Sequence, residues 1–243
     1  MANAVTVVFL HRAGIGAWIW ERVIRDLPLS GIALDVPGRQ AGVTPDSCAA
    51  ELVAELDRRG IGAVVCVLHS LAGGLAHALS ARSGSRLKSC VFVSAVIPPP
   101  GGAVIDTLGC VQRLIFRTLF AFRPGGLKPS AAMIRRTLCE DLAEQDAELV
   151  VSRYRAEMPG LYPESAGAAP ALARCTFVKL LKDRSITPTQ QDKMIGRLEN
   201  CRVHEIDSGH LVMLSAPAAL AEVCLQEAAQ SRRALAAEQY WAA

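Results

Sequence analysis

The stretch that most constrains the fold of this chain runs from Ala63 to Gly74. It begins with small and β-branched apolar residues up to Leu68, a pattern that indicates a strand buried on both faces. The pattern breaks at His69 and Ser70, and from Leu71 an alanine- and leucine-rich segment predicts a helix. A serine at such a sharp turn between strand and helix holds its hydroxyl above the end of the sheet. Ser70 is therefore a candidate nucleophile.

The residues around Ser70 depart from the usual G-x-S-x-G pattern of such turns, because Leu68 and Ala72 occupy the two glycine positions. Alanine at the second position still lets helix and strand approach closely. Leucine at the first position is bulkier and must point away from the neighbouring backbone. The motif alone supports two interpretations of Ser70 equally, a nucleophile and a serine that caps a helix N-terminus. Other residues of the chain are needed to distinguish them.

Composition limits the classes of protein to consider. With 243 residues, of which 51% are hydrophobic, the chain has the length of one large domain with room for an inserted subdomain. A net charge of +3 is too small to indicate a nucleic-acid partner. The eight cysteines show neither C-x-x-C nor metal-ligand spacing, which favours a reducing compartment. No signal-peptide pattern or apolar run of about 18 residues occurs, so we expect a cytoplasmic protein without stable membrane association.

Apolar strand patterns alternate with helical patterns along most of the chain. This alternation predicts an α/β fold with a mostly parallel, doubly wound sheet covered by helices on both faces. We expect strands at residues 5–11, 31–36, 63–68, 89–97, 176–181 and 201–206, and helices at 17–27, 45–59, 71–82, 187–198 and 217–233.

The alternation stops after Gly102 and returns near residue 174. We therefore expect a core formed by residues 1–102 and 174–243, with residues 103–173 inserted as a helical cap. Within the cap, residues 104–122 are rich in Leu, Ile and Phe, with arginines spaced along them. They could form a basic amphipathic helix that contacts a membrane. We favour the other interpretation, a cap helix whose apolar face roofs a pocket for an acyl or aryl group.

A nucleophilic serine needs a base, and the base needs an acid to orient it. His210 follows the last expected strand directly, and Asp183 follows the strand before it. Active sites in parallel sheets assemble at these carboxyl ends, and the chain order Ser, Asp, His is one of the known orders. Asp207 is a competing acid, but it lies three residues from His210 and is more typical of a turn. We therefore predict Ser70, Asp183 and His210 as catalytic residues.

Two backbone N–H groups are candidates for stabilising an oxyanion. One belongs to Leu71, the residue after the candidate nucleophile, and the other to Ala13 in the loop after the first expected strand. Arg12, beside Ala13, either turns out to solvent or contacts a carboxylate or carbonyl of the substrate.

Several segments resemble plant methyl-ester hydrolases and hydroxynitrile lyases of the α/β-hydrolase superfamily. They are residues 11–20 (HRAGIGAWIW), Thr137–Asp141 (TLCED), the Ile-Thr-Pro of residues 186–188, and residues 209–214 (GHLVML). The resemblance implies the α/β-hydrolase fold with a helical cap, and Ser70, Asp183 and His210 as its triad.

Two departures from this group bear on the reaction. The lyases carry threonine at the position of Arg12 and lysine at the position of Leu211, so this chain lacks the groups that handle cyanide. We place Arg12 and Leu211 among the substrate-binding positions and expect a hydrolase that needs no cofactor. Its expected substrate is a small hydrophobic carboxylic ester.

Two alternatives stay open. The same scaffold could cleave a thioester, a lactone or a carbon–carbon bond, or catalyse a cyclisation in natural-product metabolism. The chain could also be a binding protein for a small molecule, without catalytic activity.

Overall fold

The structure is a computed structural model that describes residues 5–11, 13–37, 42–123, 126–157, 159–165, 167 and 174–242. Six parallel strands form one sheet in the order β2-β1-β3-β4-β5-β6, which confirms the predicted parallel α/β architecture. The strands are β1 (Val5–Leu10), β2 (Gly31–Leu34), β3 (Ala63–His69), β4 (Leu87–Val93), β5 (Cys175–Leu180) and β6 (Cys201–Ile206).

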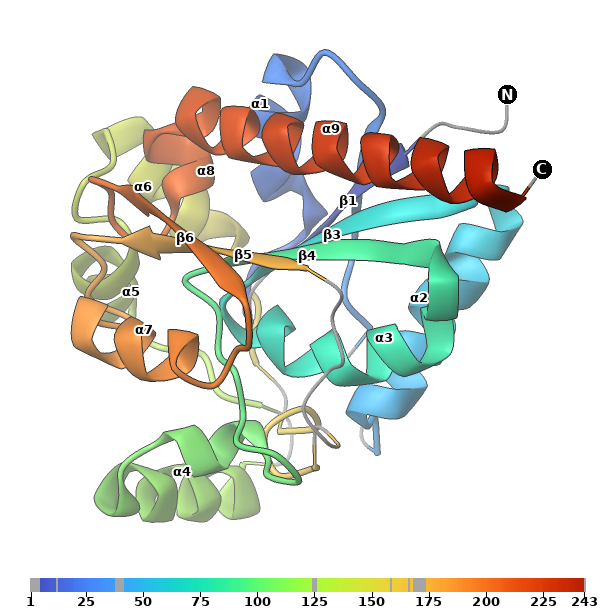
Figure 1. Cartoon of the computed structure of the whole chain (residues 1–243). Coiled ribbons are helices and arrows are strands. Elements are labelled where there is room, and N and C mark those ends of the chain that lie inside the picture. Colours follow the sequence, from blue (N-terminus) through green and yellow to red (C-terminus); the bar gives the residue numbers. More distant parts are fainter. Residues whose placement is uncertain are drawn as a thin grey trace.

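Helices cover both faces of the sheet (Figure 1). One face is covered by α1 (Glu21–Asp26), α8 (Val212–Ser215) and α9 (Pro217–Ala242), and the other by α2 (Pro45–Arg58), α3 (Ala76–Ser83) and α7 (Pro188–Ile195).

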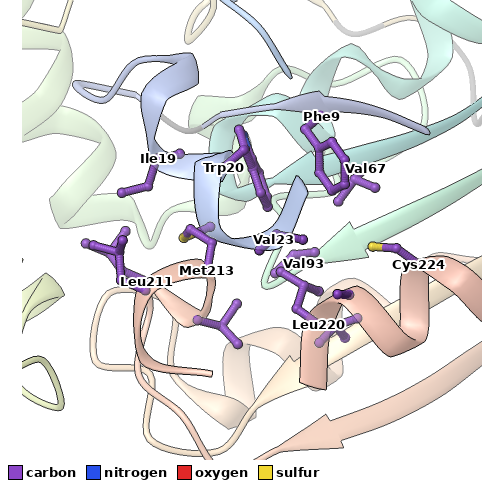
Figure 2. Packing of buried hydrophobic residues seen from close by; sticks show 14 of the residues in the cluster. Phe9, Ile19, Trp20, Val23, Val67, Val93, Leu211, Met213, Leu220 and Cys224 are labelled. Carbon is purple, nitrogen blue, oxygen red and sulfur yellow. The ribbon is translucent and has the colours of Figure 1, made fainter. Parts of the chain in front are cut away.

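Side chains of β3 alternate between two hydrophobic clusters, as the period of a strand requires. Val65 and Val67 join the cluster under α1 and α9, where Phe9 and Trp20 pack with ring centroids 5.0 Å apart (Figure 2). Leu68 joins the opposite cluster, under α2 and α3, and is fully buried there. Leu68, the bulky residue two positions before Ser70, therefore points into the core.

Four elements differ from expectation. The segment expected as one helix at 71–82 forms a 3₁₀ helix, η2 (Ser70–Leu75), followed by α3. The segment expected as one helix at 17–27 forms a 3₁₀ turn, η1 (Ala17–Trp20), followed by α1. The strand expected to reach residue 97 ends at Val93, because Ser94 has φ +38°, a left-handed conformation that ends the strand. Helix α9 continues past Arg233 to Ala242. Its last residues are mostly strong helix formers, and Glu238 pairs with Lys88 at 2.9 Å.

A helical insertion between β4 and β5 confirms the expected interruption of the sheet. It contains η4 (Val104–Thr107), α4 (Cys110–Phe122), α5 (Ala131–Leu138) and α6 (Glu144–Arg153). The division into core and cap at residues 173 and 174 stays a prediction, because residues 168–173 are outside the described part of the chain. Among the helices that the structure describes, none is long and apolar enough to cross a membrane.

Candidate active site

Ser70 lies in the sharp turn that the sequence predicts, directly after β3 and at the start of the 3₁₀ helix η2 (Ser70–Leu75). Its φ of +55° is in the left-handed region, which is costly for any residue with a Cβ. The turn is held by the carbonyl of Ser70, which accepts from the N–H of Val96 at 2.9 Å. This strained backbone is the geometry of a nucleophile elbow.

The glycine that lets the elbow pack closely is Gly73, not a residue of the usual motif. A Cβ on Gly73 would lie 2.5 Å from the carbonyl oxygen of Val96, a distance that real Cβ atoms do not adopt. Ala72 is itself almost fully buried, so its methyl group is accommodated without a glycine. The close approach that glycine usually provides at the second motif position is thus supplied one residue later.

The two predicted oxyanion donors lie at the ends of neighbouring strands, β1 and β3. Leu71 is the second residue of η2, and the first N–H groups of a helix point out of its N-terminus without an intrahelical partner. Ala13 is buried in the loop after β1.

The loop that carries Ala13 is held from two directions. The N–H of Gly14 donates to the Glu157 carboxylate at 2.6 Å, and the N–H of Ala17 donates to Asp35 at 2.9 Å. Gly14 has φ +73°, and a Cβ there would collide with the ring of Tyr154, so only glycine fits.

Asp183 and His210 meet as predicted, although 27 positions separate them. His210 Nδ1 lies 2.6 Å from Asp183 Oδ2, and both side chains are fully buried. His210 Nε2 is also buried and has no hydrogen-bond partner within the described residues. A ring held at Nδ1 by a carboxylate, with Nε2 available, has the arrangement that a general base needs.

The Asp183 carboxylate accepts three further hydrogen bonds. Ser94 Oγ donates to it at 2.6 Å, and the N–H groups of Ser185 and Ile186 donate at 2.7 and 2.9 Å. Burial acts to raise the pKa of Asp183, but the charge of His210 and the hydrogen bonds from His210, Ser94 and Ile186 outweigh it. The pKa of this carboxyl therefore lies below its ordinary value, and Asp183 stays ionised at neutral pH.

Three residues that hold the acid and base were not predicted from the sequence. Ser94 lies at the end of an apolar strand pattern, where a lone polar residue is the signal that could have found it. Gln191 is fully buried in α7 and fixes the loop around Asp183 through hydrogen bonds with the backbone of Leu180 and Ile186. His69 Nε2 lies 2.9 Å from the carbonyl oxygen of His210 and links the elbow to the histidine loop.

The helical insertion also contacts the loop that carries His210. Asp141 Oδ2 accepts from the N–H of Gly209 at 2.5 Å, and a Cβ on Gly209 would collide with the Asp141 carboxylate. A pocket of about 400 Å³ opens beside this contact, bordered by Asp183 and His210 and, from the insertion, by Thr137, Leu138 and Asp141. Ser70 does not line this pocket, so we assign no substrate to it.

The remaining predicted residues lie as follows. Within the described residues, no hydrogen bond joins Ser70 Oγ to His210 Nε2, so the structure brings acid and base together but does not complete a triad. Hydrogen bonds of this kind are often long before substrate binds.

Asp207, the competing acid, is exposed and pairs with Lys182. Leu211 is fully buried in the cluster under α1 and α9 (Figure 2), and its contact with substrate stays a prediction. Arg12 lies outside the described residues.

Comparisons with known proteins agree with this architecture. Methylesterase 18 of Arabidopsis thaliana is 25% identical over 91% of this chain and 96% of its own length. An extracellular α/β-hydrolase from a Paenibacillus species shares the fold with a TM-score of 0.78 at 19% identity, over 92% of this chain and 98% of that one. A pyrethroid hydrolase from Sphingobium faniae has a TM-score of 0.72 at 17% identity, over 93% and 98% of the two chains. The model of the alpha/beta hydrolase family matches residues 7–223, and the chain belongs to that family.

Proposed function

We propose that the protein is a serine hydrolase that cleaves a small hydrophobic carboxylic ester through an acyl-enzyme. The observation that carries this proposal is the buried 2.6 Å contact of His210 Nδ1 with Asp183, which leaves Nε2 of the same ring available. It is supported by the left-handed backbone of Ser70 and by distant relatives named as methylesterases.

In the first half of the reaction, His210 Nε2 takes the proton of Ser70 Oγ while Oγ attacks the ester carbonyl carbon. Asp183 holds the imidazolium that forms. The N–H groups of Leu71 and Ala13 stabilise the oxyanion. When the carbon–oxygen bond to the alcohol breaks, the imidazolium returns its proton to the leaving alkoxide.

In the second half, water attacks the acyl-enzyme. His210 accepts a proton from the water as its oxygen bonds to the acyl carbon. The bond to Ser70 Oγ then breaks, Oγ recovers a proton from His210, and the carboxylic acid leaves. Apart from the ester and the water, every group in both halves of this proposed mechanism comes from the chain.

Covalent labelling tests the nucleophile without knowledge of the substrate. A fluorophosphonate should add one phosphonyl group to the native protein, and Ser70→Ala should abolish both the labelling and the hydrolysis of p-nitrophenyl butyrate. Intact-mass spectrometry measures the first and absorbance the second. Thermal unfolding should change little, because alanine adds no atoms to this turn.

Ser89→Ala is the matched control, since Ser89 is equally buried but lies in β4 away from the elbow. The fluorophosphonate should label this variant as it labels the native protein, and the variant should hydrolyse p-nitrophenyl butyrate at the native rate. Absence of labelling in the native protein would instead favour a binding protein. Labelling of the Ser70→Ala variant would show that the nucleophile is a residue other than Ser70.

A further inference from the structure

Helix α4 presents an apolar face to solvent. Ile115, Leu119 and Phe122 follow the i, i+4, i+7 spacing that places side chains on one face, and their exposed fractions are 50%, 41% and 82%. Leu114, beside them, is 67% exposed. These four residues form the α4 stripe. The exposure differs from the expectation that the apolar side of this segment roofs a pocket.

A different side of α4 attaches the helix to the rest of the protein. Phe116 stacks on Tyr162 with ring centroids 6.1 Å apart, and the tilted ring of Phe120 packs against the same tyrosine at 5.2 Å. In Figure 1 the helix lies apart from the sheet, at the lower edge of the molecule. The α4 stripe is thus an outer surface of a helix whose inner surface is already packed.

The sequence segment that carries the α4 stripe is basic, although Arg113 in α4 pairs with Asp106 just before it at 3.1 Å. Between Thr107 and Cys139 the chain carries six Lys and Arg residues and no Asp or Glu. Because the whole chain has a net charge of +3, the rest of it is net negative by three. Within the described part of the chain, Arg117, Arg123 and Lys128 are exposed and form no salt bridge.

The arginines flank the α4 stripe. Arg117 lies in α4 and Arg123 caps its C-terminal end, and the helical period of 3.6 residues places the two positions on opposite sides of the apolar residues. Apolar side chains in the centre and cations at both borders are typical of helices that lie in the plane of a membrane interface, where long cationic side chains reach the headgroups.

We propose that α4 docks the protein reversibly on a lipid bilayer that contains anionic lipids. The stripe enters the interface, and Arg117 and Arg123 pair with the headgroups. A second copy of this chain is a poorer occupant, since it would bring its own Arg117 and Arg123 against the same two arginines. The expectation of no stable membrane association rested on the lack of a long apolar run, and a helix that lies in the interface needs no such run. The docking does not depend on the proposed hydrolysis.

Vesicle sedimentation tests the proposal with the full chain. The protein should sediment with vesicles of phosphatidylcholine and phosphatidylserine at low salt, and remain in solution with phosphatidylcholine alone or at high salt. Arg117→Gln together with Arg123→Gln should weaken binding roughly 30-fold, about fivefold for each arginine. Ile115→Ser together with Phe122→Ser should weaken it by about tenfold or more.

Two controls match these variants elsewhere on the surface. Arg232→Gln with Arg233→Gln removes the same charge from α9, and Val203→Ser removes an exposed apolar residue from β6, so both should bind like the native protein. Circular dichroism checks that every variant is folded. Ser70→Ala should bind vesicles fully, which separates docking from the chemistry.

Three results would overturn the proposal. They are no sedimentation with anionic vesicles, equal and salt-independent binding to both lipid compositions, and equal weakening by the α9 control. A concentration-dependent dimer that Ile115→Ser with Phe122→Ser abolishes would also overturn it, in favour of a second copy as the occupant.

Discussion

Replacement of Asp183 by asparagine probes the acid–base pair most directly. The hydrogen bonds that this carboxylate accepts determine the orientation of the asparagine side-chain amide. The N–H groups of Ser185 and Ile186 both donate to Oδ1, so the single acceptor oxygen of an asparagine takes that position. Its NH₂ group then faces Ser94 and His210, where the carboxylate has Oδ2.

His210 Nδ1 would meet a donor, so the ring would carry its proton on Nε2 instead. An imidazole in that tautomer has no lone pair on Nε2 to accept the proton of Ser70. We expect kcat to fall about 10⁴-fold, which corresponds to about 5.5 kcal/mol in the activation free energy. The variant should also lose roughly 2–4 kcal/mol of unfolding free energy, because the hydrogen bonds at this buried position become neutral ones without the negative charge of the carboxylate.

The pH dependence of stability checks the same carboxylate independently. The pKa of Asp183 is lowered in the folded state, so its ionisation stabilises the fold above about pH 4, the value for an unfolded aspartate. That contribution is lost as the pH falls through the lower, folded value. The native protein should therefore lose unfolding free energy below about pH 4 more steeply than Asp183→Asn does.

Initial rates with p-nitrophenyl butyrate and chemical unfolding measure the two effects. Asp207→Asn is the matched control, since this aspartate is exposed and pairs only with an exposed lysine in the described structure. It should retain native kcat and stability. A native rate in Asp183→Asn, or a 10⁴-fold loss in Asp207→Asn, would refute the assignment of the acid.

Three further predictions concern other parts of the chain. With leucine at position 211, mandelonitrile should release cyanide no faster than in buffer, and release that depends on Ser70 would argue for a lyase. Burial raises the pKa of Cys48 and Cys66 to about 12, so an alkylating reagent should modify the exposed Cys110 first in the native protein, as peptide mapping would show. Gly14→Ala should lower the unfolding free energy by about 2 kcal/mol or more, through strain and the collision with Tyr154. Gly60 has a similar φ of +64°, but no atom of the described residues lies near the position of its Cβ. Gly60→Ala should therefore lower the unfolding free energy less than Gly14→Ala does, and thermal unfolding of both variants measures the difference.

The fold could be predicted largely from local pattern. Strand and helix periodicities recur along the chain, and short connections leave few topologies open. Ser70, Asp183 and His210 each follow a strand of the same parallel sheet, and this topology explains why the sequence places all three at one edge. Element ends were less predictable, because a single left-handed residue such as Ser94 ends a strand that its apolar neighbours would continue.

The contacts that orient the acid and base could not be predicted, because they join residues far apart in the chain. Ser94 reaches Asp183 across 89 positions, and Asp141 reaches Gly209 across 68. No periodicity encodes such pairs. The orientation of α4 was missed for a related reason: two apolar faces share one short helix, and the sequence does not say that the one with Phe116 and Phe120 packs inward.

The helical insertion contacts both of the core loops that carry candidate site residues, and each contact is a hydrogen bond from a backbone N–H to a carboxylate. Glu157 accepts the N–H of Gly14 beside the predicted oxyanion donor, and Asp141 accepts the N–H of Gly209 beside the predicted base. Hydrogen bonds from backbone N–H groups to carboxylates are strong and directional, so a shift of the insertion would move both core loops with it. Differences in the sequence of the insertion between related chains should therefore change the rate of chemistry as well as the choice of substrate.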